Sequence, residues 1–287
     1  MSRKSLVDVL FQEIIDEIID YLEYDKKSLI SCAHTCRPFL PRAQAHIFRY
    51  VPIATRRLDD SDDGEDSIIP TRRIETLSDI VKKRPTLPRN IRILNLEISD
   101  DGAWLSKDLN FLFIMTLLDR SKELFPAISI TGENLDLHTI RFPNHPEFKT
   151  RFWKPLVAPF LTKLVLNNLE KVPIGIFLIC PRLHFLRVAD VSINTKKTFG
   201  VQEGQPQLET LEFYNDSQAV DDIFGLVNAD GPHLNPNFLR SLDVSPQSTN
   251  HLSCLPRLMA ATGSSLENLV IDDIECMKIP PSTFWVS

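Results

Sequence analysis

A short apolar template recurs seven times along the last two thirds of this 287-residue chain. It reads apolar-x-x-(Leu or Ile)-x-apolar, as at residues 161–166 and 208–213. Alternation of apolar and polar positions over so few residues predicts a strand with one buried face. A single copy cannot bury that face alone, so the copies are expected to stack against one another. The copies begin at Ile91, Phe125, Leu161, Leu183, Leu208, Leu239 and Leu266, at intervals of 22 to 36 residues.

Helix-like stretches lie between several copies, at residues 104–120, 172–180, 218–228 and 252–262, with Gly263 placed to end the last one. This alternation resembles the leucine-rich repeat, whose period is typically ~20 to 29 residues. The regular repeat has Asn or Cys at its ninth position, which no copy has here. The resemblance therefore implies an irregular solenoid with long insertions. A βαβ enzyme is the alternative, because strand and helix alternate there as well.

The N-terminal segment carries a second pattern, an amphipathic helix followed by two shorter ones. Its apolar stripe, at the spacing of a helix with 3.6 residues per turn, consists of Ile14, Ile15, Ile18, Ile19 and Leu22. Asp25 can cap a second helix that begins near Lys26. Pro38 and Pro41 end that helix and favour the start of a third, before the chain turns extended at Tyr50–Ile53. Three short helices bury their own apolar surface poorly, so part of it is expected to meet a partner.

The order of these residues resembles the F-box, which has an L-P-x-E opening, an I-x-x-I-I-x-x-L helix and a C-x-x-x-C-R-x-[W/F] element. Four segments carry the resemblance: residues 10–13 (LFQE), 15–22 (IDEIIDYL), 32–42 (CAHTCRPFLPR) and 46–49 (HIFR). The pattern most resembles F-box proteins of mushroom-forming fungi. One position departs, because Phe11 stands where the family has Pro. The resemblance implies docking to a Skp-type adaptor subunit and, through it, to a cullin. The residues implied for the Skp-binding surface are Leu10, Phe11, Ile14, Ile18, Leu22 and Leu40.

An acidic run separates the two patterns and accounts for the whole net charge of −6. It consists of Asp59, Asp60, Asp62, Asp63, Glu65 and Asp66. Such a run is typical of a solvated linker. A calcium loop is the alternative, but its twelfth position is Pro70 and not the bidentate Glu that completes calcium coordination.

The usual signatures of catalysis are missing from the sequence. It has no Gly-x-Gly-x-x-Gly, Walker loop, Gly-x-Ser-x-Gly or His-Glu-x-x-His motif. The one zinc-like spacing is Cys32, His34, Cys36 and His46, and on a helix His34 points away from the face that the two thiols share. No metal, cofactor or enzymatic activity is therefore expected.

Composition also narrows the setting. No apolar run approaches the ~18 residues needed to cross a bilayer, and Asp8 interrupts any signal-peptide core. The five cysteines are odd in number, which favours a reduced cytoplasmic or nuclear location. The basic cluster Lys82, Lys83 and Arg84 lacks interleaved aromatic residues, so nucleic-acid binding is not expected.

Together the two resemblances imply an α/β protein with an N-terminal three-helix F-box and an irregular leucine-rich-repeat solenoid. The expected domains are an F-box-like domain at 1–53, an acidic linker at 54–71 and the solenoid at 72–287. The implied function is that of a substrate-recognition adaptor of an SCF-type (Skp, cullin, F-box) ubiquitin ligase. The alternative is a leucine-rich-repeat scaffold without ligase coupling, for which Phe11 is the motivating departure.

Target binding is expected on the face formed by the fifth template position. That position gives a central column of Asn95, Ser129, Val165, Arg187, Glu212, Asp243 and Val270. Glu212 and Asp243, next to Arg187, suggest a mixed-charge groove for a basic peptide; a solvated face is the alternative. The residues expected to bind the target are Lys163, Val165, Arg187, Glu212, Tyr214 and Asp243.

Overall fold

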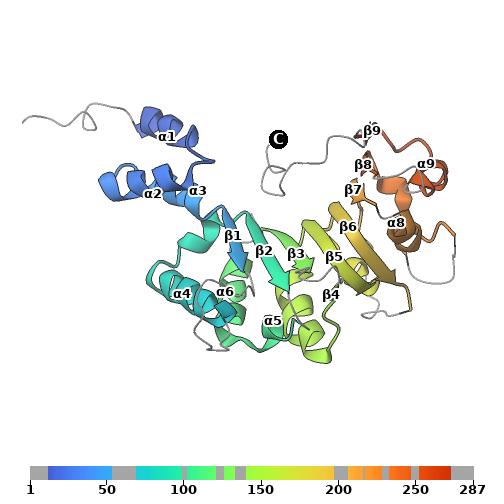
Figure 1. The fold of residues 1–287 in the computed structure, drawn as a ribbon, viewed down its shortest axis with the longest axis horizontal. Helices are drawn as coiled ribbons and strands as arrows, with labels where there is room; N and C mark the ends of the chain where they lie inside the picture. The colour runs from blue at the N-terminus through green and yellow to red at the C-terminus, as the bar shows by residue number, and fades with distance from the viewer. Residues whose placement is uncertain are drawn as a thin grey trace, which may run out of the picture.

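The computed structural model describes residues 12–53, 69–98, 102–120, 126–132, 140–196, 206–215, 217–227, 233–246 and 252–272. These residues form a nine-stranded sheet with parallel pairing throughout, the strands following one another in the order β1-β2-β3-β5-β6-β7-β8-β9 (Figure 1). Strand β4 pairs with β5. The strands are β1 (Tyr50–Ile53), β2 (Ile93–Ile98), β3 (Ala127–Gly132), β4 (Ile140–Arg141), β5 (Lys163–Pro173), β6 (Phe185–Asn194), β7 (Thr210–Tyr214), β8 (Ser241–Ser245) and β9 (Asn268–Ile271).

Each of the seven template copies forms one of these strands, as their alternation predicts. Every strand begins two residues after the first apolar residue of its template, as β5 does after Leu161 and β6 after Leu183. Both leucines are fully buried, so the template starts in the core and then enters the ladder. The fifth positions are direct neighbours across the sheet, as in the pairs of Arg187 with Val165 and with Glu212. The central column therefore runs across the strands in one line, from Asn95 to Val270.

Helices connect the strands, because parallel neighbours need a crossover between the end of one and the start of the next. The helices are α1 (Gln12–Asp20), α2 (Lys26–Thr35), α3 (Leu40–Ile47), α4 (Ile69–Lys83), α5 (Trp104–Lys107), α6 (Leu109–Arg120), α7 (Gly175–Leu178), α8 (Ser217–Phe224) and α9 (Leu255–Thr262). Shorter or irregular turns are the 3-10 helices η2 (Leu87–Asn90) and η5 (Pro236–Phe238) and the π-helix η4 (Phe148–Val157).

The main core lies between one face of the sheet and the connecting helices. Strand residues such as Leu94, Leu164 and Leu242 point into it and are fully buried. An aromatic cluster fills its centre, where Phe111 lies 5.5 Å from Phe152 between ring centroids. The opposite face of the sheet carries the central column, so the alternation of the strands sends the polar side chains to that face.

The first three helices, here called the helical unit, have a small core of their own. It is made by Ile19, Leu29 and Ala43, one residue from each helix. Asp25 caps α2 as predicted, since its side chain accepts a hydrogen bond from the Ser28 backbone N–H. A core of this size contributes little stability by itself.

The expected fold class, a three-helix F-box followed by a separate leucine-rich-repeat solenoid, is wrong. The chain enters the sheet at β1, only two residues after α3 ends, and β1 pairs directly with β2. The Arg49 carbonyl accepts hydrogen bonds from the backbone N–H groups of Arg92 and Ile93, at 2.9 and 3.0 Å. The described residues thus form one continuous α/β arrangement on an all-parallel sheet.

The structure does not describe the acidic run between β1 and α4. Residues 54–68 lie outside the described residues, and α4 begins at Ile69, inside the range expected to be a linker. The core side chains Val51 and Ile53 before that range and Ile74 and Val81 after it belong to the same cluster. The domain boundaries at 53 and 71 stay a prediction. Among the described residues, no helix is both long and apolar enough to cross a membrane.

Candidate functional site

The central column divides into a neutral half and a charged half. In the neutral half, Asn95, Ser129 and Val165 are each buried, although they lie on the face of the sheet away from the main core. The neighbouring column, two residues further along each strand, contains Thr131 and Asn167, and Asn167 Nδ2 donates to Thr131 Oγ1 at 3.3 Å. Amides and hydroxyls therefore dominate this half, and they can both donate and accept hydrogen bonds.

The charged half brings together the side chains expected to bind a target. Arg187 Nε lies 3.7 Å from Glu212 Oε2, and the Arg187 guanidinium lies 4.4 Å from the centroid of the Tyr214 ring. An arginine over an aromatic face is held by cation–π attraction. Lys163 is on β5, the strand next to the β6 strand of Arg187, and its Nζ lies 5.7 Å from the centroid of the Phe185 ring on β6. The side chains beyond Val165 thus form one connected charged group.

Burial alters the acidity of this group. It raises the pKa of Glu212, an effect that the charge of Arg187 opposes. It also raises the pKa of Asp243, and the neighbouring Asp272 carboxylate adds to that rise. Asp243 Oδ1 is buried and makes no hydrogen bond within the described part of the chain. A nearby positive charge would stabilise the ionised forms of both carboxylates.

A cavity of about 540 Å³ opens between the helical unit and the neutral half of the column. The sheet contributes Ile93, Asn95, Ser129, Val165 and Arg187 to its lining. The helical unit and the turn after it contribute Glu23, Tyr24, His46 and Arg49. Sequence reasoning included Val165 and Arg187 in the target site but missed the helical side chains, because no pattern along the chain places the α1–α2 turn beside the sheet.

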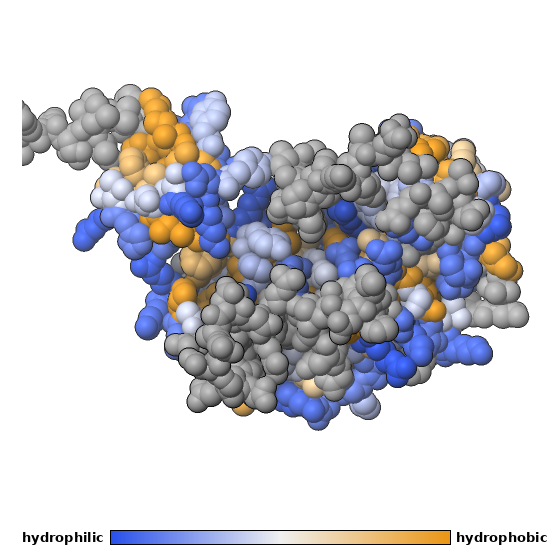
Figure 2. All heavy atoms as spheres, in the orientation of Figure 1, coloured by the Kyte–Doolittle hydropathy of each residue, from blue (hydrophilic) through white to orange (hydrophobic). Residues whose placement is uncertain are grey.

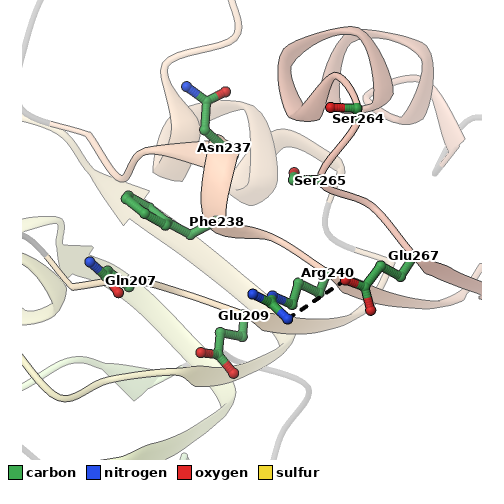
Figure 3. Close-up of a pocket in the computed structure, with 8 residues that line it drawn as sticks. All are labelled: Gln207, Glu209, Asn237, Phe238, Arg240, Ser264, Ser265 and Glu267. Atoms are coloured by element: carbon green, nitrogen blue, oxygen red, sulfur yellow. Dashed lines mark ion pairs between the residues drawn. The ribbon is translucent and has the colours of Figure 1, made fainter.

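A smaller cavity, of about 190 Å³, lies where the chain enters β7, β8 and β9 (Figure 3). Glu209, Arg240 and Glu267 line it in a row, and Arg240 Nη1 lies 3.6 Å from Glu267 Oε1. Both partners of that pair are largely exposed, so water screens their attraction. It is also much smaller, which makes it a weaker candidate than the cavity beside the helical unit.

The helical unit presents a separate apolar surface on α1. Ile15 and Ile19 are buried, whereas Ile14 and Ile18, one position earlier, are 43% and 49% exposed. Figure 2 shows hydrophobic atoms gathered in the region of α1. Exposed β-branched apolar residues one turn apart are typical of a helix face that binds a partner.

The other residues expected on the Skp-binding surface are less exposed or lie elsewhere. Leu22 and Leu40 are half-buried, and Leu22 packs against the core of the helical unit. Leu10 and Phe11 lie outside the described residues. The structure therefore brings Ile14 and Ile18 together at the surface and assigns Leu22 mainly to packing.

Thiol and metal chemistry receive little support. Burial raises the pKa of Cys180, and burial raises the pKa of Cys254 to about 12, so both stay protonated at neutral pH. Across the residues that the structure describes, no group of three His, Cys, Asp or Glu side chains could hold a metal ion. The side chains gathered in the central column are suited to binding through hydrogen bonds, apolar contact and charge.

Comparison with known proteins adds no family. No model of a known protein family matches the chain, and no curated protein matches it.

Proposed function

We propose that this protein is a substrate-recognition adaptor of an SCF-type ubiquitin ligase. In this role the helical unit binds a Skp-type subunit, which connects it to a cullin, and the sheet holds a protein target. The protein itself performs no chemistry, because a separate ubiquitin-conjugating enzyme modifies the target. It acts in the cytoplasm or the nucleus.

The observation that carries the proposal is the exposure of Ile14 and Ile18 on α1. Their neighbour Ile19 belongs to the core of the helical unit and Ile15 is buried as well, so the exposed pair is not needed for folding. Burying one such side chain against a partner contributes about 1.5 to 3 kcal/mol. The F-box-like order of residues 10–49 identifies a Skp-type subunit as the partner.

The test is co-purification of the full chain with a fungal Skp-type subunit. Ile18→Asp should abolish co-purification, because a carboxylate would be buried in an apolar contact. Ser31→Asp is the matched control, since it adds the same charge at an exposed position of α2 outside the apolar pair. Unchanged binding of Ile18→Asp would refute the proposal.

A second candidate function is a protein-binding scaffold without ligase coupling. Phe11 favours it, because the F-box family has Pro at that position and Pro sets the entry into the first helix. Affinity purification of the wild-type chain separates the two functions. Skp and cullin peptides among the partners support the adaptor, and partners without them support the scaffold.

A further inference from the structure

The cavity between the helical unit and the sheet has an apolar floor and an aromatic rim. Ile93 and Val165 are buried side chains that still line it. Tyr24, in the turn after α1, and Tyr50, at the start of β1, stand beside it and are both exposed. An aliphatic or aromatic side chain of a ligand would find apolar contact below and ring contact at the sides.

One buried amide oxygen in this cavity has no hydrogen-bond donor among the described residues. Asn95 is 8% exposed, and its Nδ2 donates to Glu97 Oε1 at 3.4 Å. Its Oδ1 accepts no hydrogen bond from the described residues. A buried amide oxygen without a donor is costly, and a ligand N–H at this point would remove that cost.

The shape of the cavity indicates an extended ligand. Its lining crosses five adjacent strands, from Tyr50 on β1 through β2, β3 and β5 to Arg187 on β6. Neighbouring strands lie ~4.8 Å apart, so the cavity extends over roughly 19 Å, the length of about six residues of extended chain. A compact metabolite would occupy only part of that length.

The charges at the cavity are already paired within the protein. At one end Arg49 Nη1 lies 2.9 Å from Glu23 Oε2, and at the other Arg187 Nε lies 3.7 Å from Glu212 Oε2. Between them Glu97 accepts the hydrogen bond from Asn95. A charged ligand residue in the middle of the cavity would lose its hydration and would have to compete with these existing contacts, so an uncharged residue is the better match.

From these features we infer that the cavity binds an extended segment of a protein, with an aliphatic or aromatic side chain over Ile93 and Val165 and an N–H directed at Asn95. This inference rests on the proposed function in taking the ligand to be part of a protein target. It adds that the helical unit is one wall of the target site, through Tyr24 and Arg49, and is more than the attachment to the ligase.

The test uses the full chain and a phage-displayed library of random hexapeptides. Panning should enrich peptides with an aliphatic or aromatic residue and an uncharged centre, and fluorescence anisotropy then measures the affinity of an enriched peptide. Val165→Arg, which fills the floor, and Asn95→Leu, which removes the acceptor, should each weaken binding at least tenfold. Arg240→Ala, at the smaller cavity, is the control and should leave the affinity unchanged.

A third variant tests the aromatic rim of the cavity. Tyr24→Ala changes a side chain that is 69% exposed, so it should fold normally while weakening peptide binding several-fold. If no peptide is enriched, or if the enriched peptides bind Val165→Arg, Asn95→Leu and Tyr24→Ala as tightly as the wild type, the inference is wrong.

Binding of each variant to the Skp-type subunit separates this inference from the proposed function. Retained Skp binding without any peptide binding refutes the inference alone. Peptide binding that depends on Asn95 and Val165, in a chain that binds no Skp-type subunit, refutes the ligase role and leaves the peptide site in place.

Discussion

Arg42 on α3 and Asp20 at the end of α1 form a bidentate ion pair. Arg42 Nε lies 2.5 Å from Asp20 Oδ1, and Arg42 Nη2 lies 2.6 Å from Asp20 Oδ2. His46 Nε2 also contacts Asp20 Oδ1, at 2.7 Å. The hydrogen bonds from Arg42 are the main reason that the pKa of Asp20 falls to about 2. This pair holds α1 against α3, the helix that leads into the sheet.

The Asp20 pair predicts a pH dependence of the helical unit. The pKa of Asp20 is lower in the folded protein than its ordinary value of 3.8, so its contribution is fully present above about pH 4 and is lost as pH falls towards 2. Both side chains are about 40% exposed, so this contribution is below about 1 kcal/mol. Hydrogen exchange of α1 should be faster in Asp20→Asn than in the wild type at pH 6, with the difference shrinking towards pH 2. An equal difference at both pH values would contradict the prediction.

Two adjacent isoleucines on α1 should differ sharply in their effect on stability. Ile19→Ala should cost about 2 to 4 kcal/mol in the helical unit, because it leaves a cavity beside Leu29 and Ala43. Ile18→Ala should cost less than about 0.5 kcal/mol, because that side chain is half-exposed. Amide exchange in α2 and α3 reports the difference, and equal effects of the two variants would show that the packing differs from this description.

Two glycines separate steric crowding from backbone strain. A Cβ at Gly132 would lie 2.1 Å from the Asn168 carbonyl oxygen, so Gly132→Ala requires β3 or β5 to move and should cost at least about 2 kcal/mol. Gly263, after α9, has φ +59° and open space around it. Gly263→Ala should cost about 1 to 3 kcal/mol, because φ +59° with ψ −121° is a backbone conformation that L side chains rarely adopt. Denaturant unfolding measures both costs, and a neutral Gly132→Ala would count against the close approach of β3 and β5 at this position.

Charge reversal tests the charged half of the central column. Glu212→Lys combined with Asp243→Lys should weaken binding of basic partners about tenfold or more at low salt, because two carboxylates become two repelling ammonium groups. Glu209→Lys combined with Glu267→Lys is the control, since it makes the same change in charge at the smaller cavity. Crosslinking and mass spectrometry compare the partners, and an unaltered set for the first variant would argue against a basic target.

The strands and the central column could be predicted from sequence because their signals are local. Each template has the same alternation of buried and outward-facing positions, so its fifth residue faces the same side of the sheet in every copy. Arg187 therefore meets Glu212 although the copies are unevenly spaced. Helix α4 was missed despite a readable signal, since Ile74, Leu77, Ser78 and Val81 have helical spacing and are buried.

Other features depend on relations that no local pattern shows. The π-helix η4 contains Pro155, which looks like a helix breaker in the sequence, while its aromatic residues are held in place by the main core. The fold class was wrong because the extended segment Tyr50–Ile53, although predicted, carries no local signal that it pairs with β2 in the same sheet. Tyr24 lies beside the cavity only in the folded chain, and no pattern in the sequence places it there.

Only Phe48 and Arg49 separate α3 from β1. Phe48 packs against the main core, and the Arg49 carbonyl is held by two backbone N–H groups of the next strand. The connection therefore has little freedom to act as a hinge. Two proteins bound at once, one on α1 and one on the sheet, would be held at a fixed angle and distance. Under the proposed function, this rigid geometry would determine which lysines of a target come within range of the conjugating enzyme.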